Sequence, residues 1–193
     1  RDFTLTQAMI ALLKPHQYEA TNMSLQMLPD QSVLLSWMMG LGKSLAAIAI
    51  CDALFSYYLY TIKTIAHIII IVPACLVGNW KNELAKFQQH TCGWPHYCYL
   101  NEKVGMQDSM FTNWKTYGGV MVVSYQQYGN IVIEDNKPDS KLNIVLRIFD
   151  EIHTLRNEDT QCFAIAAKHS DKTGFIPTLG LTGTPIQNSV LDL

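Results

Sequence analysis

The sequence predicts an α/β fold in which helices cover both faces of a central, mostly parallel sheet. Short apolar runs alternate along the chain with segments of helical periodicity, the pattern of strand–helix–strand units. The run Ile68–Val72 is continuously apolar, as in strands whose two faces are both covered. Apolar residues make up 49% of the 193 residues and charged residues 16%, so one domain with a substantial core is expected.

Six apolar runs are expected to form the strands. They are Val33–Ser36, His67–Val72, Tyr97–Leu100, Val120–Ser124, Ile144–Phe149 and Thr178–Thr182. Helices are expected between them, among others at Lys43–Tyr58 and Leu76–Gln88, the second with apolar residues at helical spacing. The polar segment Ile133–Lys141 contains a proline and is expected to be a surface loop.

Candidate site residues, most of them polar, lie at or just after the ends of these strands. They are Ser36, Trp37, Pro73, Ser124, Asp150, Glu151 and Thr182. Open parallel sheets bind ligands outside the carboxyl ends of their strands. The functional site is therefore expected along that edge of the sheet.

The segment Gly40–Ser44, sequence GLGKS, lies between an expected strand and an expected helix. Glycines let the backbone turn tightly, so that its N–H groups point at phosphate oxygens. Lys43 would reach the β- and γ-phosphates, and the Ser44 hydroxyl would ligate Mg²⁺. Trp37 stands where the usual phosphate-loop pattern begins with glycine, so an ordinary glycine turn before a core helix is the alternative.

Two adjacent carboxylates, Asp150 and Glu151, directly follow the apolar strand that begins near Ile144. We assign Asp150 to Mg²⁺ and Glu151 to orienting and deprotonating the attacking water. A pair of solvated acids at a strand end is the alternative. The phosphate loop upstream in the same α/β pattern favours the catalytic interpretation.

Five segments, in this order and spacing, resemble the motifs of helicase superfamily two and, within it, of Swi/Snf-type DNA translocases. Leu13–Gln17 resembles the entry motif, Met39–Ser44 the MGLGKT loop, Ile71–Glu83 the VPxxLxxNWxxE block, Asp150–His153 the DEAH box, and Leu181–Asn188 the LTGTPxQN block. The last of these is matched almost letter for letter. The resemblance spans the chain from Leu13 to its last residue.

This resemblance implies a RecA-like P-loop NTPase lobe that binds ATP and Mg²⁺. The implied ATP-binding residues are Gln17, Met39, Gly40, Leu41, Gly42, Lys43 and Ser44. The implied catalytic residues are Asp150, Glu151 and Lys43, with Ser44 and Asp150 on the metal. Residues 1–193 would be the first lobe of a longer chain, and a second RecA-like lobe would complete the motor.

The resemblance also implies how ATP is coupled to DNA. His153, Thr182, Gly183 and Thr184 would link the nucleotide site to the DNA groove, and Pro73, Ser124 and Tyr125 would lie near the DNA backbone. Each has an ordinary structural alternative, such as a strand stop for Pro73 or a core aromatic for Tyr125. The net charge of −2 gives no electrostatic case for nucleic acid.

Two departures from the family pattern bear on activity. Trp37 and Met38 stand where an acidic pair is expected, and Ile152 stands where alanine or glycine is expected. The phosphate cradle itself is retained, so ATP binding is still expected. A β-branched residue at Ile152 could crowd the loop without touching either carboxylate.

Three hypotheses of function follow. The first is the ATP-hydrolysing lobe of a double-stranded-DNA translocase, which by resemblance would act in the nucleus on nucleosomes or another DNA-bound complex. The second is a nucleotide- or DNA-binding module with little or no turnover. The third, a small-molecule kinase with the same phosphate loop, is weakened by the DEIH and LTGTPIQN segments.

Two further patterns have ordinary interpretations. His90, Cys92, His96 and Cys98 cluster, but their spacing matches none of the standard zinc pairings, and Cys98 is expected to be a small buried hydrophobe. Leu45–Thr61 is barely long enough to cross a membrane, contains an aspartate, and follows the phosphate loop directly. We expect a buried helix there, and no membrane partner.

Overall fold

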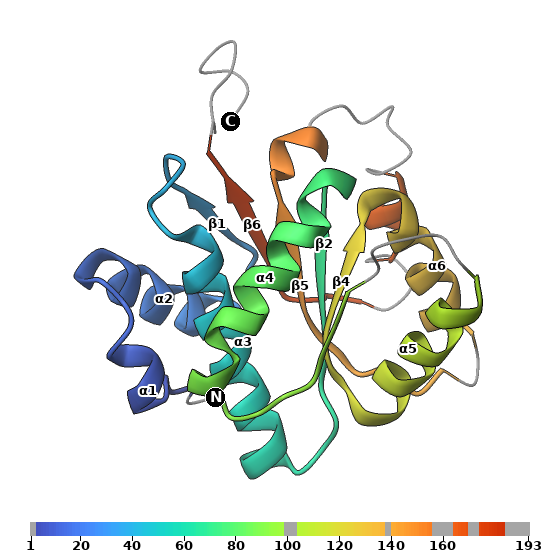
Figure 1. Ribbon diagram of the computed structural model, residues 1–193, viewed down its shortest axis with the longest axis horizontal. Coiled ribbons are helices and arrows are strands. Elements are labelled where there is room, and N and C mark those ends of the chain that lie inside the picture. The colour runs from blue at the N-terminus through green and yellow to red at the C-terminus, as the bar shows by residue number, and fades with distance from the viewer. Residues whose placement is uncertain (1–2, 99–103, 138–139, 156–163, 170–173, 184–193) are drawn as a thin grey trace.

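The computed structural model describes residues 3–98, 104–137, 140–155, 164–169 and 174–183. Six strands form one sheet in the order β1-β6-β5-β2-β4-β3, and every neighbouring pair is parallel (Figure 1). The strands are β1 (Val33–Ser36), β2 (His67–Val72), β3 (His96–Cys98), β4 (Gly119–Ser124), β5 (Ile144–Asp150) and β6 (Thr178–Thr182). The predicted α/β fold with a parallel sheet is confirmed.

The predicted strands agree closely with these bounds. β1, β2 and β6 match to the residue, β4 begins one residue earlier, and β5 continues through Asp150. β3 begins at His96, and the last two residues of its predicted range lie outside the described residues. The inclusion of Asp150 matters for function, because the rigid sheet itself then positions this carboxylate.

Helices connect the strands. They are α1 (Gln7–Ile10), α2 (Pro15–Met27), α3 (Lys43–Ser56), α4 (Val77–Phe87), α5 (Val104–Tyr117) and α6 (Tyr125–Asp135). A π-helical segment, Tyr57–Ile62, continues α3, and short 3₁₀ turns lie at Ala74–Leu76, Gln88–His90 and Ile152–Leu155. Residues 164–169 are also helical.

The predicted surface loop Ile133–Lys141 is wrong at its start, because α6 continues to Asp135. A capping box at Ser124 and Gln127 starts this helix, and its apolar face is buried as far as Val132. Helical hydrogen bonding therefore extends past the last apolar anchor, into residues whose polarity suggested a loop.

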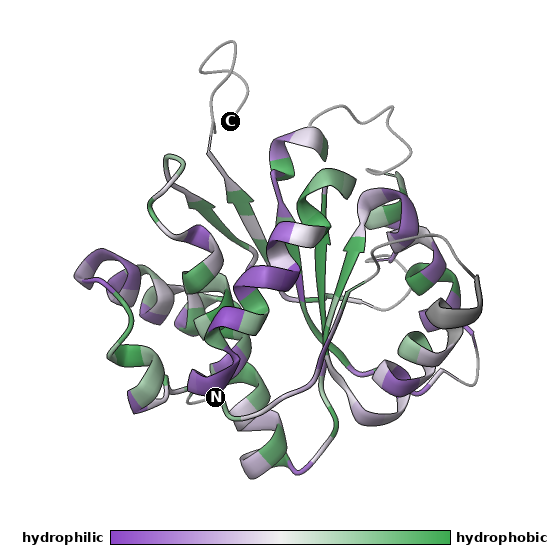
Figure 2. Ribbon diagram, in the orientation of Figure 1, coloured by the Kyte–Doolittle hydropathy of each residue, from purple (hydrophilic) through white to green (hydrophobic). Residues whose placement is uncertain are grey.

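Helices cover both faces of the sheet, as Figure 1 shows, and each face has its own apolar core. Alternate residues of β2 supply the two cores. Ile68 and Ile70 join the core with α3 and α4, whereas Ile69 and Ile71 pack with Trp114 of α5. The hydropathy colouring of Figure 2 shows the central strands as continuously apolar, which agrees with burial on both sides.

The segment Lys43–Ile62 is long and apolar enough to cross a membrane by length and composition alone. In this structure, however, α3 is a core helix whose residues from Ala46 to Phe55 are all buried. Asp52 lies within that stretch, fully buried and hydrogen-bonded. The structure therefore agrees with the prediction of a buried helix.

Candidate nucleotide-binding site

The loop from Trp37 to Gly42 joins β1 to the first turn of α3 and lies beside the end of β6. The Trp37 N–H donates to the Thr182 carbonyl at 3.2 Å, which ties the loop to β6. Gly40 and Gly42 both have φ of +82°, a left-handed conformation that favours glycine. Gly42 is the N-cap of α3, so the loop delivers the chain directly to a helix N-terminus.

Gln17, at the start of α2, is buried against this loop. Its Oε1 accepts from the Lys14 N–H at 2.8 Å, and its Nε2 donates to the Leu41 carbonyl at 2.9 Å. A Cβ on Gly42 would lie 2.1 Å from Gln17 Nε2, so a side chain there would displace the Gln17 amide from its present position. Gln17 therefore braces the loop in this structure, and its predicted part in ATP binding stays a prediction.

Trp37 takes part in the loop through its backbone, while its side chain packs elsewhere. The indole lies edge-on to His16, with ring centroids 5.5 Å apart, and packs against the apolar core. The Trp37 carbonyl accepts a hydrogen bond from Lys43 Nζ at 2.8 Å. A tryptophan is therefore compatible with this loop, because the position supplies main-chain groups.

Lys43, the first residue of α3, folds back over the loop. Besides the Trp37 carbonyl, its Nζ contacts the Met38 carbonyl at 3.4 Å. A Cβ built on Gly183, just past β6, would lie 3.7 Å from the same Nζ. The ammonium group thus lies between the loop and the end of β6, where it can exchange backbone carbonyls for phosphate oxygens.

Asp150 ends β5 and is 9% exposed. Its Oδ2 accepts from the Trp80 indole Nε1 at 2.7 Å, and its Oδ1 accepts from the Glu151 N–H at 3.0 Å. Burial raises the pKa of the Asp150 carboxyl, although the hydrogen bond from Trp80 acts in the opposite direction. A carboxylate held in this way favours a bound cation, because the cation offsets the loss of hydration.

Glu151 has φ of +52°, an uncommon conformation for a residue with a side chain. Such backbone strain costs about 1 to 3 kcal/mol and clusters at functional sites. Its Oε2 lies 3.3 Å from His153 Nδ1, and the same nitrogen lies 3.2 Å from Thr182 Oγ1. A chain of contacts therefore connects Glu151 to the end of β6, as the coupling assignment of His153 and Thr182 expects.

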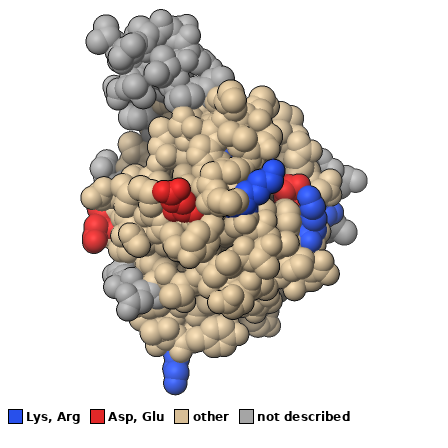
Figure 3. Space-filling view, turned by 90° about the vertical axis from the view of Figure 1, so that its left-hand side faces the viewer, with Lys and Arg blue, Asp and Glu red and all other residues tan. Residues whose placement is uncertain are grey.

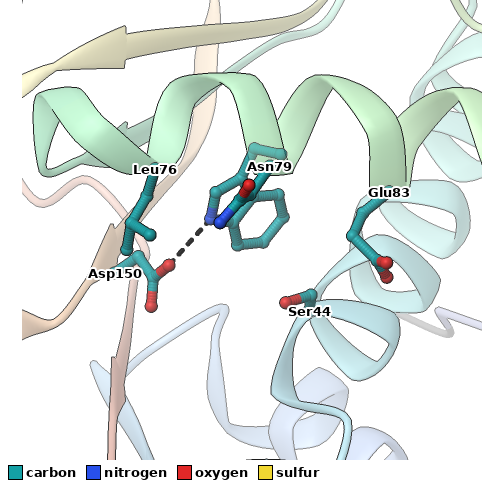
Figure 4. Close-up of a pocket in the computed structure, with 6 residues that line it drawn as sticks. Ser44, Leu76, Asn79, Glu83 and Asp150 are labelled. Atoms are coloured by element: carbon teal, nitrogen blue, oxygen red, sulfur yellow. Dashed lines mark hydrogen bonds between the residues drawn. The ribbon is translucent and has the colours of Figure 1, made fainter.

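A pocket of about 120 Å³ lies between α3, α4 and the end of β5. Its lining residues are Ser44, Leu76, Asn79, Trp80, Glu83 and Asp150. Figure 4 shows Ser44 between the Asp150 carboxylate on one side and the Glu83 carboxylate on the other, with its hydroxyl directed to the Asp150 side. Mg²⁺ prefers hydroxyl, carboxylate and water oxygens, so the donor set here fits the predicted ion.

The residues predicted near DNA lie along the same edge, with their side chains engaged in the fold. Ser124 caps α6, its Oγ accepting from the Gln127 N–H at 3.2 Å. The Tyr125 ring is buried, and its hydroxyl donates to the Asp150 carbonyl at 2.8 Å. Pro73 precedes the 3₁₀ turn after β2. DNA contact by these residues stays a prediction, and Thr184 lies outside the described residues.

Sequence reasoning missed the role of Trp80, which it treated as part of an apolar helix face. The indole is buried, as predicted, but its N–H group is directed at the candidate metal ligand Asp150. The signal was available, because Trp80 belongs to the segment that resembles the NWxxE block. A buried indole N–H generally needs a hydrogen-bond acceptor, so its burial alone indicates a polar partner.

Ile152 is accommodated by a glycine opposite it. A Cβ on Gly180 of β6 would lie 2.8 Å from Ile152 Cδ1 and 3.0 Å from Leu34 Cδ1. The larger side chain therefore occupies space that Gly180 leaves open. Its effect on activity stays a prediction.

The cluster of histidines and cysteines is divided in the structure. Cys98 is buried, and burial raises the pKa of its thiol to about 11. The Cys92 N–H and the Trp94 indole donate to Asp52 at 2.7 and 3.1 Å. Within the described part of the chain, no group of three or more potential ligands could hold a metal ion.

Charge on the surface gives little indication of a nucleic-acid face. On the side of the molecule drawn in Figure 3, the described Lys and Arg side chains are few, and acidic side chains are interspersed with them. This agrees with the net charge of −2. Any DNA contact on this side would rest on individual contacts, because a basic patch is the usual electrostatic footprint.

The fold and the loop define a P-loop lobe of the RecA-like class. Comparison with protein families then matches residues 16–193 to the SNF2-related domain. The chain belongs to this family, and the resemblance predicted from its motifs is confirmed.

Relatives in plants, yeast and mammals share this region. Protein CHROMATIN REMODELING 5 of Arabidopsis thaliana is 26% identical over 190 residues, which cover 94% of this chain and 10% of the relative. ATP-dependent helicase FUN30 of Saccharomyces cerevisiae is 29% identical over 182 residues, which cover 94% of this chain and 15% of the relative. The human SWI/SNF-related regulator of chromatin of subfamily A containing DEAD/H box 1 is 30% identical over 190 residues, covering 89% and 17%.

The chain thus spans between a tenth and a fifth of the length of these relatives. A solved structure, the Sulfolobus solfataricus SWI2/SNF2 ATPase core in complex with dsDNA, superposes with a TM-score of 0.66 at 23% identity. The superposition covers 94% of this chain and 34% of that one. At this identity the structural likeness supports the fold, and it agrees with the RecA-like class.

Proposed function

We propose that this chain is the ATP-binding and ATP-hydrolysing lobe of a double-stranded-DNA translocase of the Swi/Snf chromatin-remodelling type. One observation carries the proposal. Lys43 and Ser44 of the phosphate loop and the carboxylates Asp150 and Glu151 meet at the same end of the sheet, although more than half of the chain separates the two pairs. Membership of the SNF2-related domain family supports it.

The phosphate end of the site follows from the loop. On ATP binding, Lys43 Nζ would leave the carbonyls of Trp37 and Met38 and bind the β- and γ-phosphates, while loop N–H groups cradle the same oxygens. Ser44 and Asp150 would hold Mg²⁺, which when bound would offset the negative charge of the phosphates. The N-terminus of α3 adds a partial positive charge.

The hydrolytic end follows from the strained turn after β5. Glu151 would orient the attacking water and accept its proton. His153 contacts both Glu151 and Thr182, so it would transmit the state of the carboxylate to the end of β6. By the same proposal, Gly183 and Thr184 continue this coupling toward a DNA groove.

The partners are part of the proposal. The relatives named for chromatin remodelling and the neighbour solved with dsDNA support double-stranded DNA, and nucleosomes or another DNA-bound complex, as substrates in the nucleus. A second RecA-like lobe would complete the site, with residues 1–193 as the first lobe. The alternative of a binding module with little turnover is favoured by one feature, the replacement of the acidic pair by Trp37 and Met38.

A second lobe is proposed because phosphoryl transfer needs positive charge on the γ-phosphate, often from an arginine worth roughly 10³ to 10⁵ in rate. Arg147 is buried and donates to Thr178 Oγ1 at 3.0 Å and toward Tyr128 at 3.4 Å. Its guanidinium is therefore committed to the fold. The other arginines, Arg1 and Arg156, lie outside the described residues.

The experiment is phosphate release by residues 1–193, with and without duplex DNA, and with and without the second lobe. We expect Mg-ATP binding, very slow turnover without the second lobe, and DNA-stimulated turnover with it. Lys43→Ala is the control, and it should weaken ATP binding at least about tenfold. Strong DNA-stimulated turnover by residues 1–193 alone would contradict the need for a second lobe, and equal ATP affinity of parent and Lys43→Ala would remove the phosphate-loop assignment.

A further inference from the structure

Helix α4 and the residue before it present one mixed polar and apolar face to the candidate nucleotide site. Leu76, just before the helix, and Asn79, Trp80 and Glu83 within it recur at intervals of three or four residues, so they lie on one helix face. All four line the pocket that also contains Ser44. The helix is amphipathic and buries Trp80 on its inner side, so this face lies at the junction between the apolar core and the pocket.

The Asp150 carboxylate is held at both of its oxygens. Oδ2 accepts the Trp80 indole N–H at 2.7 Å, and Oδ1 accepts the Glu151 N–H at 3.0 Å. The two bonds fix the plane of the carboxylate, because one donor comes from α4 and the other from the chain just after β5. Each carboxylate oxygen can accept more than one hydrogen bond or metal bond, so both retain capacity toward the pocket.

We propose that Trp80 is a positioning residue for the metal site. Its indole N–H orients the Asp150 carboxylate toward the Ser44 side of the pocket, so that α4 forms part of the Mg²⁺-nucleotide site. This inference rests on the proposed function, because it assigns Asp150 to the metal.

The chemistry of the donor fits this role. An indole N–H donates and cannot accept, so it favours the ionised carboxylate, whose oxygens only accept. It is also uncharged, so the full negative charge of Asp150 stays available to a cation, which a lysine or arginine in its place would partly neutralise. Partners that orient metal ligands in this way typically change metal affinity about 10- to 100-fold when they are removed.

The chain contains a matched control. Trp94 is buried like Trp80, and its indole N–H donates at 3.1 Å to Asp52, a carboxylate of the core. Trp80→Phe and Trp94→Phe each keep an aromatic ring and remove one N–H that is bonded to a buried carboxylate. Both variants therefore lose one buried hydrogen bond, and they differ in which aspartate loses its indole donor.

The experiment measures nucleotide affinity of the full chain against Mg²⁺ concentration, with a fluorescent ATP analogue as the probe, at a temperature where thermal unfolding shows each variant folded. Trp80→Phe should raise the Mg²⁺ concentration for half-maximal affinity about tenfold and leave affinity in chelator unchanged. Trp94→Phe should leave both within about twofold of the parent, a range below the orienting effect. Equal Mg²⁺ dependence of the two variants would overturn the inference.

A second measurement uses only the parent chain, so it does not depend on whether a variant folds. In an NMR titration of the nucleotide-bound parent with Mg²⁺, the indole N–H resonance of Trp80 should shift, while that of Trp94 should not. If neither or both respond alike, Trp80 is not coupled to the metal. A parent that shows no Mg²⁺-dependent nucleotide binding at all would instead overturn the proposed function, and this inference with it.

Discussion

Two buried aspartates, Asp52 and Asp150, have similar hydrogen-bonded surroundings but different proposed roles. Each lies in or against the core on the α3 and α4 side of the sheet and accepts a hydrogen bond from a buried indole. Asp52 accepts two more, from the Cys92 N–H at 2.7 Å and the Thr6 hydroxyl at 3.1 Å. It thereby ties α3 to two distant segments of the chain.

Asp150 has fewer donors and a pocket beside it. Only its own neighbour, the Glu151 N–H, adds to the Trp80 bond among the donors to its carboxylate that the structure describes. Burial raises the pKa of Asp150, because it removes hydration from the carboxylate, and a bound cation would offset that loss. A buried carboxylate surrounded by donors acts as a structural tie, whereas one with spare oxygen capacity at a pocket is a candidate ligand.

The largest expected effect concerns the residue next to Asp150. In the complete motor, Glu151→Gln should reduce ATP turnover about a hundredfold or more, because a general base typically contributes at least that much. ATP affinity should stay near the parental value, since the amide keeps the size of the side chain. Steady-state phosphate release and nucleotide titration measure the two quantities. Turnover at the parental rate would contradict the assignment of Glu151 as the base.

The next prediction tests whether Asp52 stabilises the fold without taking part in the Mg²⁺ site. Asp52→Asn should lower the free energy of unfolding by about 2 kcal/mol, because the three hydrogen bonds to this side chain lose the assistance of its negative charge. Urea denaturation measures this as a lower midpoint. The Mg²⁺ dependence of nucleotide affinity should be unchanged under conditions where the variant is folded. An unchanged midpoint would mean that Asp52 is not the tie that its hydrogen bonds suggest.

The smallest expected effect concerns zinc binding near Cys92, whose backbone N–H donates to Asp52. We expect no stoichiometric zinc and no shift of the melting temperature with a chelator, because a structural zinc site would contribute directly to folding energy. The Cys92 N–H is bonded to Asp52, and burial raises the pKa of the Cys92 thiol to about 11, so its thiolate is scarce at neutral pH. Elemental analysis that found one zinc per chain would contradict this.

The strands and the position of the candidate site were predictable because their signals are local. β1, β2 and β6 are apolar runs bounded by polar residues, and their predicted ends are correct. Parallel strands align their carboxyl ends, so a loop after β1 and acids after β5 were expected to share one edge. The pocket lined by both Ser44 and Asp150 agrees with that expectation.

The remaining features depend on contacts between residues far apart in the sequence. The Trp80–Asp150 bond joins residues 70 positions apart, and the Trp94–Asp52 bond joins residues 42 apart. Periodicity identifies a buried tryptophan but does not show which acceptor its N–H will meet. The positive φ of Glu151 could not be predicted from the sequence either, because no glycine marks the position and the turn depends on tertiary contacts.

The most direct test of the account compares Asp150→Asn with Asp52→Asn in one assay, nucleotide affinity as a function of Mg²⁺ concentration. Asp150→Asn should abolish most of the Mg²⁺-dependent gain in affinity, because the amide removes the negative charge and one of the two oxygens that a cation could use. Asp52→Asn should keep the Mg²⁺-dependent gain and melt at a lower temperature. If Asp150→Asn bound nucleotide with the parental Mg²⁺ dependence, the assignment of this edge of the sheet as the ATP–Mg²⁺ site would be wrong.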